Sequence, residues 1–79
     1  MDIAVVDKSE RGLMTLRLYD DDHQIIECES FAELYTLNFH LRTLAKKRSI
    51  EKGLLLIHDR SKNTVNLSIA CDENSFFVG

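Results

Sequence analysis

The fold depends most on residues Ser30–Gly53, which read SFAELYTLNFHLRTLAKKRSIEKG. The first four match a capping box, in which the Ser hydroxyl accepts a hydrogen bond from the Glu33 amide and the Glu33 carboxylate reaches back to the Ser30 amide. Basic residues gather near the other end, where cations favour helix carbonyls, and Gly53 can take the left-handed conformation that ends a helix. The stretch predicts one long helix. An alternative reading breaks it near Arg48, with Ser49 beginning a separate short turn.

This helix is predicted to carry two different stripes. The broad face that should pack on a sheet holds Phe31, Leu34, Leu37, Asn38, Leu41, Leu44 and Ala45. A second line, rotated to one side, holds Tyr35, Phe39, Arg42 and Lys46 at i, i+4, i+7 and i+11. Aromatic residues and arginine anchor protein interfaces, so this line indicates a recognition surface. The plainer reading is that both rings widen the core contact and both cations form a solvated flank.

Strand-like segments lie on both sides of the helix. They are Ile3–Val6, which begins the first strand, then Leu13–Tyr19, Gln24–Glu29, Leu54–His58 and Thr64–Ala70. Alternation predicts inward rows made of Met14, Leu16 and Leu18 in the second strand and of Val65, Leu67 and Ile69 in the last. The apolar residues 75–79 either add a short strand, which we favour, or cover a sheet edge.

The resulting order, β-β-β-α-β-β with a possible C-terminal strand, predicts one compact α+β domain over residues 1–79. We expect a small antiparallel sheet with the helix packed across one face. The first two strands and the last two should each form a hairpin. The opposite sheet face should be open, partly apolar or used in dimerisation.

Length limits the function classes. A chain of 79 residues buries only roughly 60–65% of its unfolded surface, so a covering partner or a homodimer is favoured over an enclosed small-molecule site. No basic-then-apolar signal region is present, and no apolar run approaches the roughly 18 residues of a membrane span. We therefore expect a cytoplasmic protein. Cys28 and Cys71 are predicted to be buried thiols, with a disulfide as the alternative.

Charge is distributed unevenly. Nine of the 13 acidic residues but three of the ten basic ones lie between Met1 and Glu33, so this part carries about −6 and the remainder about +3. Such asymmetry can orient a partner. The acidic turn Asp20, Asp21 and Asp22 does not match a calcium loop, because Ile25 and Phe31 stand where Gly and Glu are needed. It is read as a turn, with an acidic patch that occupies a basic groove as the alternative.

The basic cluster consists of Arg42, Lys46, Lys47, Arg48 and Lys52, with His40 nearby. Together with Tyr35 or Phe39 it could bind nucleic acid. The net charge of −3 disfavours this, since phosphate neutralisation dominates nucleic-acid affinity.

Catalytic and metal-binding signatures are not found. No Ser or Cys lies in a glycine-framed elbow, and three glycines cannot make a phosphate-cradling loop. His23, His40 and His58 lack helical metal-pair spacing and are expected at surfaces or turns. We expect neither an enzyme nor a resident metal or cofactor.

The sequence thus favours a small protein-interaction module, a regulator or inhibitor that occludes a larger protein and self-associates, of the accessory kind that phages, other mobile elements and bacteria encode. The predicted partner-binding residues are Tyr35, Phe39, Arg42, Lys46, Asp20, Asp21 and Asp22. The alternative is nucleic-acid binding through the basic half of the helix.

Overall fold

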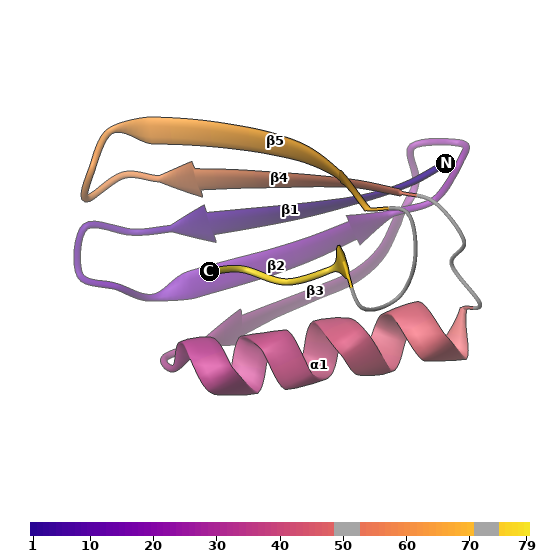
Figure 1. Ribbon diagram of the computed structural model, residues 1–79, viewed down its shortest axis with the longest axis horizontal. Helices are drawn as coiled ribbons and strands as arrows, with labels where there is room; N and C mark the ends of the chain where they lie inside the picture. Colours follow the sequence, from indigo (N-terminus) through magenta and orange to yellow (C-terminus); the bar gives the residue numbers. More distant parts are fainter. Residues whose placement is uncertain (49–52, 71–74) are drawn as a thin grey trace.

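The computed structural model describes residues 1–48, 53–70 and 75–79. Its elements are β1 (Asp2–Lys8), β2 (Met14–Tyr19), β3 (Ile25–Phe31), α1 (Leu34–Lys47), β4 (Gly53–Asp59) and β5 (Thr64–Ala70). This is the predicted α+β order, and Figure 1 shows one sheet with the helix to one side of it. Both hairpins, β1 with β2 and β4 with β5, form as expected.

The sheet is mixed, whereas the sequence predicted an antiparallel one. Its strand order is β3-β2-β1-β4-β5, and the central pair β1 and β4 is parallel. The cause is the position of α1 between β3 and β4. The helix returns the chain to the end at which β3 began, so β4 must run in the direction of β3 and therefore of β1.

One face of the sheet forms the core with α1. The predicted inward row of β2 is buried there, and so are Leu37, Leu41, Leu44 and Ala45 from the predicted packing face of the helix. The same core contains Ala4 and Val6 of β1 and Leu55 of β4. Two residues of the predicted packing face do not pack as expected. Leu34 is exposed, and Phe31 is half-buried and belongs to β3, not to the helix.

The helix is shorter than predicted at both ends. Ser30 belongs to β3, where its hydroxyl lies 3.3 Å from that of Thr15, so the capping box does not form. Glu33 is the N-cap residue and makes no side-chain capping bond. Gly53 begins β4 and does not end the helix. The alternative break near Arg48 is confirmed, because α1 ends at Lys47, and the turn expected at Ser49 lies outside the described residues.

The predicted strand over residues 75–79 is not present. This segment has no strand pairing, but Phe76 and Val78 are buried in the core. The Asn38 side chain binds this segment through two hydrogen bonds to one residue. Its Nδ2 donates to the Val78 carbonyl and its Oδ1 accepts from the Val78 amide, each at 2.8 Å. The segment therefore covers the core without extending the sheet (Figure 1).

The orientation of β5 reverses the sequence prediction. Leu55, which is buried under the helix side, pairs with Ser68, while Leu56 pairs with Leu67. Val65, Leu67 and Ile69 therefore point to the face opposite α1 and are exposed. Alternation shows which residues share a face but not which face the helix covers. The helix contacts β2 and β3, which lie toward the edge of the sheet opposite β5. Where the structure describes it, this second face is exposed and partly apolar along β5, as expected, and its use in dimerisation stays a prediction.

Among residues 1–48, 53–70 and 75–79, no helix combines the length and the apolar character needed to cross a membrane.

Candidate interaction site

The side chains of Tyr35 and Phe39, the two aromatic residues of the predicted recognition surface, are exposed to solvent. Tyr35 is 74% and Phe39 is 70% exposed, whereas Leu37 and Leu41 of the same helix are buried. The two rings are four residues apart, so they lie one above the other on the helix surface. Their exposure removes the plainer reading, in which both rings widen the core contact. Their binding role stays a prediction.

A second pair of aromatic residues, from the C-terminal segment, turns this line into a groove. Its volume is about 480 Å³, and its lining residues are Leu34, Tyr35, Asn38, Phe39, Arg42, Phe76 and Phe77. Phe76 is buried beneath it, while Phe77 is exposed beside the helix rings. We call this feature the aromatic groove. The sequence indicates only that residues 75–79 are apolar, and nothing in it places Phe77 beside the helix rings.

The groove has a basic end. Arg42 lines it and is exposed, and Lys46 follows one helical turn later, also exposed. Arg48 is engaged within the molecule, because its Nε donates to an Asp2 carboxylate oxygen at 2.8 Å. That hydrogen bond, with the nearby charges of Asp2 and Asp20, raises the pKa of Arg48 above its usual value despite partial desolvation.

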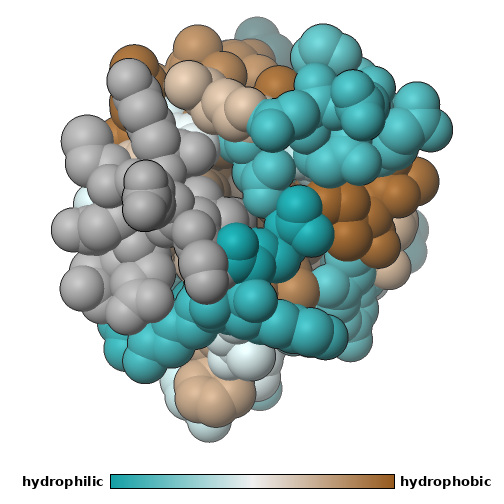
Figure 2. Space-filling view, turned by 90° about the vertical axis from the view of Figure 1, so that its right-hand side faces the viewer, coloured by the Kyte–Doolittle hydropathy of each residue, from teal (hydrophilic) through white to brown (hydrophobic). Residues whose placement is uncertain are grey.

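The acidic turn does not join the aromatic groove. It connects β2 to β3 near the N-terminus, at the end of the sheet where α1 finishes, whereas Tyr35 is in the first turn of α1 at the opposite end (Figure 1). The Asp20 carboxylate accepts the amides of Asp22 and Gln24, and Asp21 pairs with the amino group of Met1. Asp20 and Asp21 therefore have structural contacts within the molecule. Figure 2 shows this end of the fold, where hydrophilic and hydrophobic side chains lie in separate patches.

His40, which was expected at the surface or in a turn, is half-buried against β3. Its Nε2 is 2.7 Å from Glu27 and 3.2 Å from Glu29, both on β3, and its ring packs 5.2 Å from that of Phe31. One ligand atom from each of the two carboxylates and the imidazole lies within 4.8 Å of the others, a spacing that a divalent cation could bridge. In the structure, the imidazole contacts both carboxylates and so connects α1 to β3. No sequence pattern indicates this cluster, because its members come from two elements.

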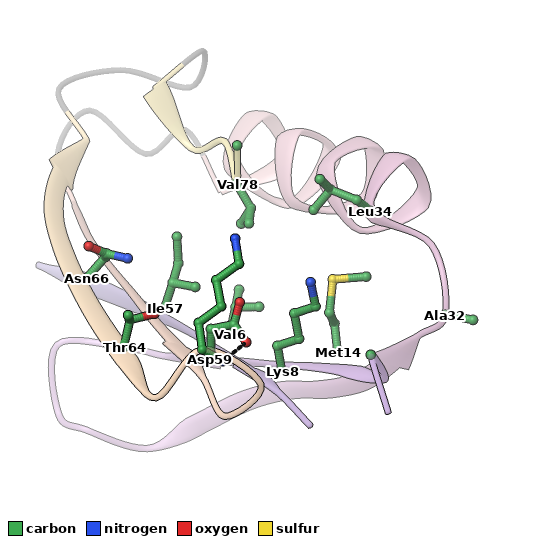
Figure 3. A pocket seen from close by; sticks show the side chains of 13 residues that line it. Val6, Lys8, Met14, Ala32, Leu34, Ile57, Asp59, Thr64, Asn66 and Val78 are labelled. Carbon is green, nitrogen blue, oxygen red and sulfur yellow. Dashed lines mark hydrogen bonds between the residues drawn. The ribbon is translucent and has the colours of Figure 1, made fainter. Parts of the chain in front are cut away.

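A second hollow of about 360 Å³ lies between the sheet and the start of α1. Figure 3 shows Val6, Met14 and Ile57 on its sheet side, Leu34 and Val78 opposite them, and Lys8, Asp59, Thr64 and Asn66 around it. Asp59 is buried, and one of its oxygens accepts the Ser61 hydroxyl and the amides of Ser61 and Lys62.

The environment of Asp59 is that of a hairpin turn. The Ser61 hydrogen bond is the largest influence on its carboxyl group and, with the Lys62 amide and the Lys8 charge, holds the pKa below its usual value, although burial opposes this. These bonds shape the connection between β4 and β5. We therefore assign Asp59 a structural role.

Cys28 is an exposed free thiol, which corrects the prediction of a buried one. It lies in β3 opposite the half-buried Arg17, on the open face of the sheet. Cys71 lies outside the described residues. Two of the predicted surface or turn histidines agree with the structure, since His23 is exposed in the β2–β3 turn and His58 is partly exposed on β4.

Comparison with protein-family models, with curated proteins and with solved structures found no match to this chain.

Proposed function

We propose that this chain is a protein-interaction module whose aromatic groove takes an apolar side chain of a partner protein, with an acidic group of that partner beside Arg42. The observation that carries the proposal is the exposure of Tyr35 and Phe39 next to Phe77, around a groove of about 480 Å³. Large exposed aromatic residues that converge on one hollow are typical of interface hot spots.

The chemistry of the partner follows from the lining of the groove. Rings and the Leu34 side chain favour an aliphatic or aromatic anchor, because burying such a group removes apolar surface from water. Arg42 at one end, with Lys46 beyond it, favours a carboxylate one or two residues from that anchor. Partner binding would occlude this surface, which is how a small regulator or inhibitor acts on a larger target. An exposed free thiol at Cys28 suits the reducing cytoplasm in which we expect it to work.

The acidic turn is a weaker candidate than the aromatic groove for contacting the partner protein. It lies at the opposite end of the fold from Tyr35, and two of its three carboxylates are already engaged. A partner would have to span the length of α1 to reach both sites. We retain Asp22 as the contact residue of the turn, because its carboxylate has no hydrogen bond or ion pair within the described residues.

Selection from a random peptide library displayed on phage tests the proposal. We expect enriched peptides to combine an aliphatic or aromatic residue with Asp or Glu. Their affinity should fall by about tenfold or more in the Tyr35→Ala/Phe39→Ala variant, since hot-spot residues contribute more than about 1.4 kcal/mol each. Arg42→Gln should weaken binding and reduce its salt dependence.

The matched control is Leu13→Ala/Ile25→Ala, which also removes two exposed apolar side chains but outside the groove. This control should bind as the wild type does, and both double variants should melt cooperatively. Peptides that bind the groove variant as tightly as the wild type would overturn the proposal. Loss of the cooperative melt in the groove variant would show instead that the rings support the core.

Nucleic-acid binding is the alternative function. It has weaker support, because Arg48 is already paired with Asp2 within the molecule. Titration with generic RNA and DNA at two salt concentrations separates the two functions. Binding that weakens steeply with salt and depends on Lys46 and Lys47 would favour nucleic acid.

A further inference from the structure

The two edges of the sheet are built differently. The edge strand β3 carries Glu27 and Glu29, which face the helix side, and its pairing with β2 shifts register between Leu18 and Tyr19. Inward-pointing charges and bulges are the devices by which proteins keep an edge strand from pairing with another chain. The β3 edge is therefore protected.

The edge strand β5 lacks these devices. Its sequence, TVNLSIA, has no charged residue and no proline, and its seven residues pair with β4 without a register shift. Six of the seven are exposed, and Leu67 in the middle is 63% exposed. A seven-residue, uncharged edge with regular pairing offers a row of backbone donors and acceptors to another strand.

The open face beside this edge is apolar. The pairing registers align Val5 of β1 with Leu56 of β4 and Leu67 of β5, and they align Ile3 with Leu54 and Ile69 in the same way. Within the described residues, α1 and residues 75–79 pack on the other face. Two apolar rows therefore run from the centre of the sheet to the β5 edge and end there in water. Additional strands would continue them.

We propose that β5 pairs antiparallel with β5 of a second copy of this chain, about a two-fold axis at Leu67, to form one continuous ten-stranded sheet. This register sets Val65 opposite Ile69 of the second copy and Asn66 opposite its Ser68. Apolar residues then meet on the open face and polar residues meet on the helix side, as stable cross-strand pairs require.

The register favours a second copy as the occupant, because in it β5 is complementary to itself. Each chain carries a net charge of −3, so two copies repel each other in general, but β5 brings no charge to the contact. A two-fold interface also closes on itself and leaves only the two β3 edges at the ends of the sheet. Because those edges are protected, assembly stops at the dimer.

Sedimentation velocity over a dilution series tests this dimer. The wild type should have the mass of a dimer that dissociates on dilution. Leu67→Lys and Leu67→Glu should each weaken dimerisation by about tenfold or more, because two like charges meet at the axis. An equal mixture of the two variants should recover the dimer, since opposite charges then face each other.

The matched control is Ile25→Lys, which places the same charge at an exposed apolar position on the β3 edge. It should dimerise as the wild type does, and the cooperative melting of every variant should be checked. A monomeric wild type, or a dimer that Leu67→Lys leaves intact, would overturn the proposal. A dimer that Tyr35→Ala/Phe39→Ala disrupts would assign self-association to the aromatic groove instead. Because β5 and the groove lie on different parts of the fold, failure here leaves the proposed function standing.

Discussion

Adding one methyl group at Gly53 should destabilise the protein by about 1–3 kcal/mol, the usual cost of overpacking a core. A Cβ atom at this position would lie 2.5 Å from Cζ of Phe76 and 3.0 Å from the backbone oxygen of Asp2. Phe76 is buried, and Asp2 pairs with Gly53 in the sheet, so neither neighbour can move away freely. For a domain of this size the loss is a large fraction of a total stability of about 4–12 kcal/mol.

A double-mutant cycle identifies the cause of this loss. Phe76→Leu shortens the side chain that Gly53→Ala would strike, so the Gly53→Ala change should cost at least about 0.5 kcal/mol less in that background. Urea unfolding followed by circular dichroism gives each free energy, provided that the m value is unchanged. Gly79→Ala is the control, because a Cβ there would meet no atom within 4 Å.

Two results would refute the reasoning. If Gly53→Ala is as stable as Gly79→Ala, the close approach of Phe76 does not restrict this position. If Gly53→Ala costs the same in both backgrounds, the cost comes from the Asp2 backbone oxygen, 3.0 Å from the added Cβ atom, and not from the ring.

Two further predictions concern the Asp59 turn and the Asn38 contact. The pKa of Asp59 is lowered from 3.8 in the folded state, so its stabilisation is complete above that value and is lost as the pH falls through the lowered pKa. Asp59→Asn should therefore be less stable than the wild type at neutral pH, and the difference in their free energies of unfolding should shrink as the pH falls below about 4. Urea midpoints at several pH values measure this difference, and a difference that stays constant would exclude the linkage. Asn38→Ala should cost about 1–3 kcal/mol, since it removes two hydrogen bonds to Val78, and Asn38→Asp, which keeps only the acceptor, should also be destabilised. If both variants unfold at the wild-type urea concentration, the buried side chains alone hold this segment.

Period-two alternation was enough to locate the strands but not to orient them. The bounds of β5 were predicted correctly, yet its apolar row was placed on the wrong face. Which face α1 covers depends on the crossover between β3 and β4, and no local pattern in residues 64–70 carries that information. The parallel pairing of β1 with β4 has the same origin.

The start of the helix shows how a tertiary contact overrides a local motif. Ser30 and Glu33 have the spacing of a capping box, but Ser30 pairs with Thr15 and Phe31 pairs with Met14 in the sheet. Extending β3 satisfies backbone groups that a capping box would leave to side chains. Local sequence could not weigh the two outcomes, because the competing strand lies about 15 residues away in sequence.

The candidate site was predictable in part. The spacing of Tyr35 and Phe39 correctly separated them from the core stripe, because Leu37, Leu41 and Leu44 already fill one helix face. The groove itself could not be found, because Phe77 joins it from a segment that is about 40 residues away in sequence and is held through Asn38.

The contact of Phe76 and Val78 with the core also bears on how this protein is made. A nascent chain that has left the ribosome as far as β5 holds all five of the strands that the structure describes, but its core still lacks Phe76 and Val78. Completion of the native fold therefore waits for residues 75–79 to emerge.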